Sequence, residues 1–117
     1  MKMKVLTRFS ALTVIMFVAC AAHATIITNA LWTFEVSQPT TSGPHAPEFG
    51  SGQAIQFGAT TITSPLGNGS ARSFSANQWN TGEYFQFRTT TLGHHSIKLE
   101  WDQTRSATGP DDFTLQY

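Results

Sequence analysis

The acidic residues near the end of the chain are the first candidates for chemistry. Glu100 and Asp102 are two positions apart, so both side chains point to the same face if this segment is a strand. Paired carboxylates serve elsewhere as general acid and base or as calcium ligands. Lys98 shares that face, and apolar residues separate the three charges. We therefore interpret this face as solvated rather than catalytic.

A second acidic pair, Asp111 and Asp112, follows Gly109 and Pro110. Loop carboxylates bind calcium together with backbone carbonyl oxygens, which makes this pair a candidate metal site. Aspartate is also a common turn residue because its side chain bonds to nearby backbone. We favour the turn, and we predict no metal and no cofactor.

Histidine and cysteine offer no zinc site. His94 and His95 are adjacent, so their rings point to opposite faces of a strand and one ion does not easily take both. His45 lies far away in a proline-rich stretch, Cys20 is the only cysteine, and no HExxH pattern occurs. The usual ligand spacings for zinc are therefore missing from the sequence.

Two further motifs of enzymes are incomplete. Residues 67–70 read GNGS, but a phosphate-binding loop needs a following helix, and none is predicted. The same residues form a sound turn, because glycine and asparagine tolerate positive φ. No GxSxG motif surrounds any serine, so we predict that the protein is not an enzyme.

The three tryptophans are the candidates for sugar binding, because exposed aromatic rings can stack on sugar rings. Trp32 and Trp101 lie in segments where apolar and polar residues alternate, so we predict that both face a core. Trp79 lies between Gln78 and Asn80 in a polar loop. It is the one aromatic residue that we consider a candidate ligand-binding residue.

The elements that position these residues are predicted to be strands joined by long polar loops. Alternating or β-prone segments cover residues 25–35, 53–59, 83–90, 97–102 and 113–117, with an extension over 60–63 past a bulge at Gly58 and a short strand near 72–75. No segment after residue 24 keeps a helical period for more than about one turn. This pattern predicts an all-β fold, an antiparallel β-sandwich. Residues 92–94, which read LGH, are predicted to form a turn. The apolar positions expected to face the core are Trp32, Phe34, Ile55, Phe57, Phe85, Phe87, Ile97, Leu99, Trp101, Phe113, Leu115 and Tyr117.

The first 24 residues predict a signal peptide. Lys2, Lys4 and Arg8 precede an apolar run over residues 11–22, which is too short for a helix that spans a bilayer. Ala22-His23-Ala24 supplies the small residues that signal peptidase requires, so we predict a signal-peptide helix over 1–24, cleavage between Ala24 and Thr25, and one domain over 25–117.

Two alternatives compete for this segment. A buried helix with a basic start is the less favoured one. Residues 17–20, which read FVAC, are similar to a lipobox, in which case Cys20 is lipidated. Either cleaved form is exported, to the periplasm, the extracellular space or the cell surface, and the expected product of cleavage before Thr25 has no stable membrane anchor.

The composition after residue 24 excludes some partners. Residues 25–117 carry four lysine or arginine residues against seven aspartate or glutamate residues, a net charge of −3. A weakly acidic domain without basic clusters is not expected to bind nucleic acid. No disulfide is possible after cleavage, so stability must come from a modest core.

Several segments together resemble a known family. They read LWTFE at 31–35, PEFGSG at 47–52, GNGSARSFSANQWNTGEYFQF at 67–87 and WDQTRSATGPDDFTLQY at 101–117. In this order they resemble the N-terminal part of exported bacterial proteins of the PEP-CTERM group, over most of residues 30–117. The resemblance implies a jelly-roll-like domain on a protein sorted by an exosortase-type system, with a role in extracellular polysaccharide or biofilm matrix. It supplies no catalytic residues, and the sorting tail of the group, a Pro-Glu-Pro motif with an apolar span and a basic end, is missing.

We therefore expect a fragment of a larger sandwich. Such folds need about seven or eight strands, and the pattern offers fewer, so residues 25–117 alone are expected to be poorly folded or self-associating. The leading hypothesis for function is an exported, non-catalytic structural or adhesive domain of the cell surface or extracellular matrix. The alternative is a carbohydrate-binding module, and extracellular polysaccharide is the expected partner in both cases. A secreted hydrolase ranks last.

Overall fold

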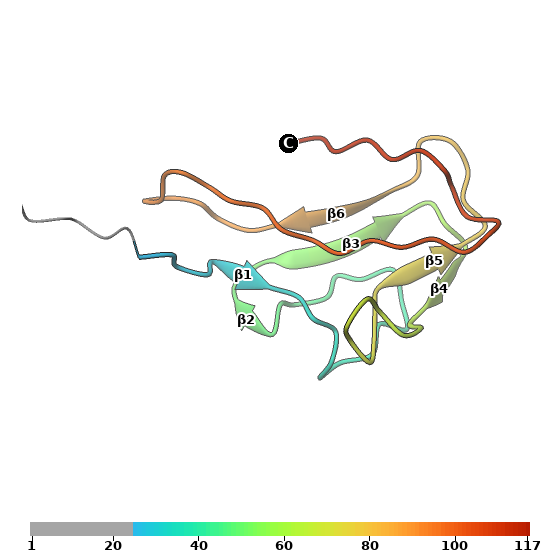
Figure 1. Ribbon diagram of the computed structural model, residues 1–117, viewed down its shortest axis with the longest axis horizontal. Coiled ribbons are helices and arrows are strands. Elements are labelled where there is room, and N and C mark those ends of the chain that lie inside the picture. The colour runs from blue at the N-terminus through green and yellow to red at the C-terminus, as the bar shows by residue number, and fades with distance from the viewer. Residues whose placement is uncertain (1–24) are drawn as a thin grey trace, which may run out of the picture.

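The computed structural model describes residues 25–117, and all regular structure in this part is β (Figure 1). The strands are β1 (Ala30–Leu31), β2 (Phe49–Gly50), β3 (Gln53–Phe57), β4 (Thr61–Thr63), β5 (Ser75–Asn77) and β6 (Tyr84–Arg88). They form three two-stranded antiparallel sheets, β1–β2, β3–β6 and β4–β5. The all-β prediction is thus confirmed for residues 25–117, which contain no helix that is able to cross a membrane. The predicted signal-peptide helix and Cys20 lie outside the described residues.

The β3–β6 pair is the longest ladder, and its register decides which residues are buried. Ala54 lies opposite Phe87 and Gln56 opposite Phe85, so these four side chains share one face. Ala54 is fully buried and Gln56 is 3% exposed. This register confirms that Phe85 and Phe87 share a face, but Phe87 is 50% exposed, so its predicted burial is wrong.

The predicted inward phase of β3 is wrong. Ile55 is only half-buried and Phe57 is 38% exposed, whereas the residues between and before them are buried. Side chains alternate strictly along a strand, so a shift of one residue exchanges the two faces. Phe57 instead stacks on Tyr84 at 4.8 Å between ring centroids, on the outer face of the sheet.

The chain changes sheets directly after β3. The predicted strand over residues 53–63 is interrupted at Gly58, which has a φ of +101°. Residues after this turn form β4, which pairs with β5 and not with β6. The strand predicted near residues 72–75 is therefore present, but it begins at Ser75 and continues to Asn77.

The core is a cluster of aromatic rings on the inner face of β3–β6. Phe74 is its centre, with ring centroids 5.5 Å from Phe34, 4.9 Å from His45 and 4.9 Å from Phe85. Trp79 extends the cluster with an edge-to-face contact to Phe85 at 5.1 Å. These rings come from segments far apart in sequence, so their packing joins the three small sheets. We call Phe34, His45, Phe74, Trp79 and Phe85 the aromatic cluster.

The predicted first strand is also shorter than expected, because only two residues of 25–35 form a ladder. Trp32 contacts Phe87 at 5.4 Å, and its indole N–H donates a hydrogen bond to the carbonyl of His45. Phe34 is 7% exposed and has a positive φ of 59°, so the extended chain ends there. The inward positions predicted for Trp32 and Phe34 are therefore consistent with the structure, although β1 ends before them.

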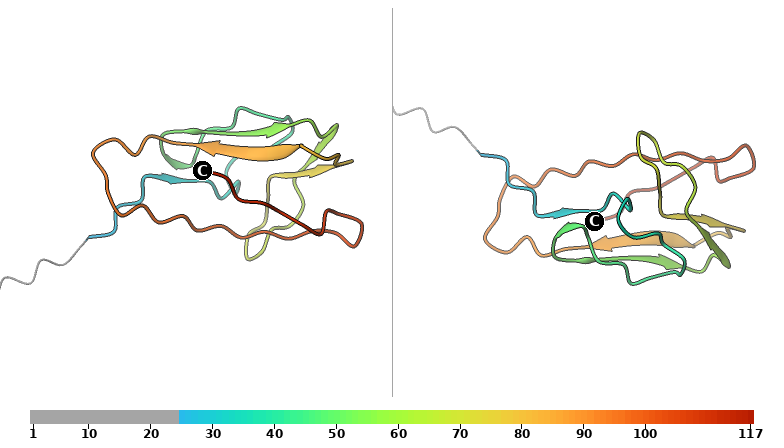
Figure 2. Two further views of the ribbon diagram at one scale, coloured as in Figure 1. Left: turned by 90° about the horizontal axis from the view of Figure 1, so that it is seen from above. Right: turned by 90° about the horizontal axis from the view of Figure 1, so that it is seen from below.

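The last two predicted strands are wrong as strands. Residues 97–102 and 113–117 belong to no ladder within the described residues. Ile97, Leu99, Trp101, Phe113 and Leu115 are each between 55% and 60% exposed, and Tyr117 is fully exposed, so their predicted inward orientation is also wrong. In both views of Figure 2 the segment after residue 95 crosses the molecule on the side opposite the β3–β6 sheet. A strand needs a hydrogen-bonded neighbour as well as an alternating pattern, and residues 25–117 supply none here.

Candidate functional site

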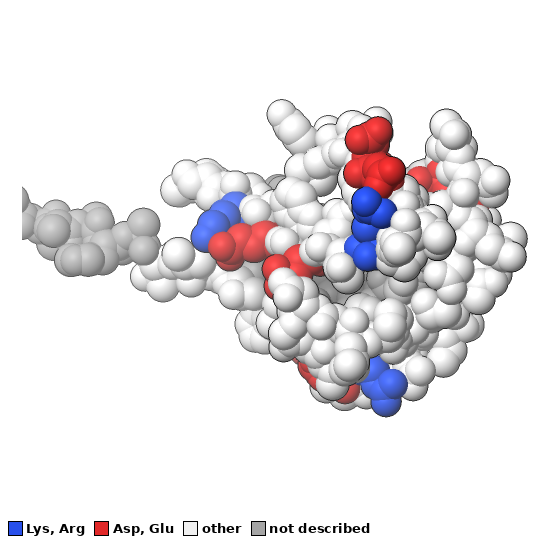
Figure 3. Space-filling view, turned by 45° about the vertical axis from the view of Figure 1, so that its right-hand side comes forward, with Lys and Arg blue, Asp and Glu red and all other residues white. Residues whose placement is uncertain are grey.

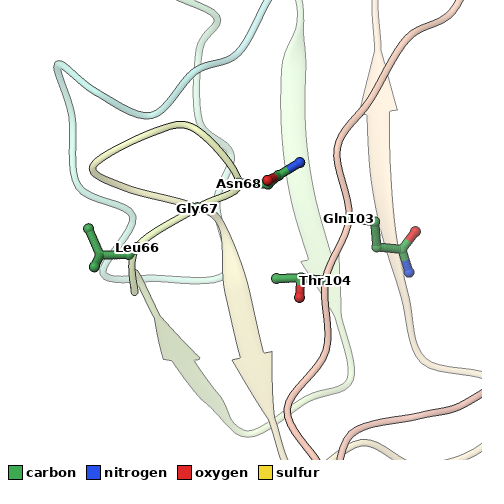
Figure 4. A pocket seen from close by; sticks show the side chains of 5 residues that line it. All are labelled: Leu66, Gly67, Asn68, Gln103 and Thr104. Carbon is green, nitrogen blue, oxygen red and sulfur yellow. The ribbon is translucent and has the colours of Figure 1, made fainter.

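An open groove lies between the loop before β5 and the C-terminal part of the chain (Figure 4). It has a volume of about 470 Å³ and is lined by Leu66, Gly67, Asn68, Gln103 and Thr104. The predicted turn forms one wall, closed by a hydrogen bond of 2.9 Å from the Gly67 amide to the Ser70 carbonyl. The loop is held to the other wall by the Asn68 amide, which donates to the Asp102 carboxylate at 3.2 Å.

Apart from Leu66, the side chains that line the groove are neutral and polar. Figure 4 shows Asn68 and Thr104 on the groove side, whereas Gln103 points to the other side of its segment. Amide and hydroxyl groups both donate and accept hydrogen bonds, so they suit a neutral polar ligand such as a sugar hydroxyl. Neither group is a nucleophile or a general base by itself.

Trp79, the candidate ligand-binding residue, lies in the aromatic cluster rather than in this groove. It is half-buried, and its indole N–H already donates to the Ala76 carbonyl at 2.7 Å. Buried tryptophan normally satisfies its N–H in this way. The polar neighbours Gln78 and Asn80 concealed this, because the packing partner Phe85 lies six residues later, in β6.

Trp101 has the exposure that was expected of Trp79. It is 58% exposed, and its indole N–H donates to the amide oxygen of Gln103 at 3.3 Å. An open aromatic face therefore lies next to an amide group. The alternating pattern around Trp101 concealed this, because it predicts a buried position only if a second layer covers it.

Of the four acidic candidates, Glu100 and Asp111 form ion pairs. Asp111 pairs with Arg105, and the Gly109 amide donates to the Ser106 carbonyl at 3.0 Å, so a hydrogen-bonded turn directly precedes the acidic pair. Asp112 is exposed. Among residues 25–117, no three histidine, cysteine, aspartate or glutamate side chains lie close enough to hold a metal ion.

The other charged pair also faces solvent. Lys98 and Glu100 form an ion pair of 2.6 Å, with side chains 66% and 76% exposed. This agrees with a solvated face for these residues, although they form no ladder. Exposed pairs of this kind contribute only about 0–1 kcal/mol. Figure 3 shows one face with few charges, of both signs and in small groups, on a mainly uncharged surface.

The histidines divide between surface and core. His94 and His95 are both exposed beside the predicted turn, where the His94 amide donates to the Thr91 carbonyl at 2.9 Å. His45 is half-buried, pairs with Ala54 through backbone hydrogen bonds of 2.9 Å, and has its ring in the aromatic cluster. The packing of His45 depends on residues far away in sequence, so it was not predicted from the residues around His45.

Comparisons of the chain with protein-family models, with curated proteins and with solved structures gave no match. The resemblance to the PEP-CTERM group therefore stays a prediction.

Proposed function

We propose that the protein is an exported, non-catalytic structural or adhesive module of the cell surface or extracellular matrix. The observation that supports this most is the apolar surface of residues 97–102 and 113–117. Ile97, Leu99, Trp101, Phe113 and Leu115 are each between 55% and 60% exposed. Large apolar side chains exposed along two segments in this way are candidates for contact with another macromolecule.

Membership of the PEP-CTERM group and a jelly-roll-like sandwich belong to the same proposal. Both C-terminal segments are extended and alternate in polarity, as sandwich strands do. If other strands pair with these two segments, they and the three small sheets are sufficient to form the two facing sheets of a sandwich. Extracellular polysaccharide is the proposed partner, since the weakly acidic charge does not favour nucleic acid.

Export is tested first. When the full chain is expressed in a bacterial host, we expect the periplasm or medium to contain a product that begins at Thr25, as measured by mass spectrometry. Ala24→Arg should block cleavage, because the peptidase requires a small residue there, and Ala24→Gly should not. Uncleaved chain in the cytoplasm contradicts export. A diacylglyceryl group on Cys20 instead shows that the chain is cleaved before Cys20, as in a lipoprotein.

A carbohydrate-binding module is the second candidate, and the exposed ring of Trp101 beside Gln103 favours it. We expect Trp101→Ala to remove binding to a glycan array, because loss of the ring removes the stacking surface. Trp79→Phe is the matched control, since it keeps an aromatic ring in the cluster and should retain binding. Equal binding by wild type and Trp101→Ala contradicts this candidate.

A further inference from the structure

We propose that residues 97–101 pair with the same residues of a second copy of the chain, antiparallel, with the two-fold axis at Leu99. The second copy is a partner for the proposed adhesive role, and the function of this pairing in the cell rests on that role. The pairing itself is a property of the purified protein.

The backbone of this segment is free to pair. Within residues 25–117, no backbone-to-backbone hydrogen bond involves any residue of 97–102. Figure 2 shows the segment extended along the outside of the molecule, on the side away from the β3–β6 sheet. An extended segment with a row of unpaired N–H and C=O groups is a template for another strand.

The charges of the segment are complementary to a second copy of itself. With Leu99 opposite Leu99, each Lys98 lies opposite Glu100 of the other copy, and each Ile97 lies opposite Trp101. Opposite charges and apolar pairs directly across an antiparallel ladder are both stabilising. One patch that complements itself in this way is the requirement for a two-fold dimer.

Other registers are less favourable. A shift by one residue places charged side chains opposite apolar ones. Centring the pair on Lys98 or on Glu100 places two like charges directly opposite each other, which is destabilising. Residues 113–117 contain no charged side chain, so they have no comparable means of fixing a register.

Disulfide trapping tests the register directly. In the full chain with Cys20→Ser, Leu99→Cys is expected to form a covalent dimer on mild oxidation, because opposed Cβ atoms in a ladder are about 4.5–5.5 Å apart and need only a small adjustment. Leu92→Cys is the matched control, since Leu92 is 90% exposed and lies outside the paired segment. Equal crosslinking at both positions overturns the proposal.

Charge reversal provides a second, independent test by sedimentation equilibrium. Lys98→Glu and Glu100→Lys should each raise the dissociation constant of the dimer about tenfold, because two favourable pairs become two repulsive ones. The double variant should restore the wild-type constant. A wild-type protein that stays monomeric at its solubility limit, or a double variant that is no better than the single ones, overturns the proposal. Failure of export or of glycan binding does not affect either result, so the two proposals fail separately.

Discussion

Replacing Phe74 by alanine in the full chain should strongly lower the midpoint of unfolding. The ring contacts Phe34, His45 and Phe85, all within 5.5 Å between centroids, so its loss disconnects the centre of the aromatic cluster. Truncation of a core phenylalanine costs about 3–5 kcal/mol. Small domains have only about 5–15 kcal/mol in total, and a domain with so few fully buried side chains is expected near the lower end. Thermal and urea unfolding followed by circular dichroism measure the effect.

The control for this prediction is Leu92→Ala. Leu92 is also a large apolar residue, but it is 90% exposed and lies in a turn. Its truncation should leave the unfolding midpoint unchanged within about 0.5 kcal/mol. Equal midpoints for Phe74→Ala and the wild type contradict the assignment of the aromatic cluster as the core.

Gly50→Ala should destabilise the protein far more than Gly93→Ala, although both glycines have a φ of +80°. An added Cβ at Gly50 would lie 2.0 Å from the backbone carbonyl oxygen of Asn29, whereas at Gly93 it meets no atom within 4 Å. The left-handed backbone costs alanine about 1–2 kcal/mol at either site. The additional clash at Gly50 can be relieved only by separating β2 from β1, since Gly50 pairs with Ala30.

Hydrogen exchange locates the effect of Gly50→Ala. The Glu48 amide donates to the Leu31 carbonyl at 2.9 Å, so this amide should lose its protection in Gly50→Ala and keep it in Gly93→Ala. Similar midpoints and similar protection in the two variants contradict the close approach of β1 and β2.

Turns and the shared face of Phe85 and Phe87 were predicted correctly from sequence, whereas the contacts between separate segments were not. The turns at residues 67–70 and 92–94 depend on glycine and asparagine, and the shared face of Phe85 and Phe87 depends on alternation alone. Both signals are local, and both agree with the structure. The predicted orientation of β3 was wrong because Ala54, which lies between β6 and the backbone of His45, is buried instead of the larger Ile55 and Phe57.

The relative exposure of Trp79 and Trp101 was predicted incorrectly, because Trp79 is half-buried and Trp101 is 58% exposed. A polar sequence neighbourhood suggested an exposed Trp79, but Phe85 covers part of its ring. An alternating neighbourhood suggested a buried Trp101, but burial requires a second layer, which residues 25–117 do not provide. Exposure of an aromatic residue is thus a property of its partners in space, which sequence neighbours do not specify.

The hydrogen bond between Asn68 and Asp102 has a kinetic consequence. It is the only hydrogen bond between residues 97–117 and the rest of the described chain. Local opening requires only the free energy of the contacts that are broken. Residues 97–117 can therefore detach and return many times while the aromatic cluster stays folded, and proteases should cut this tail long before they cut the core.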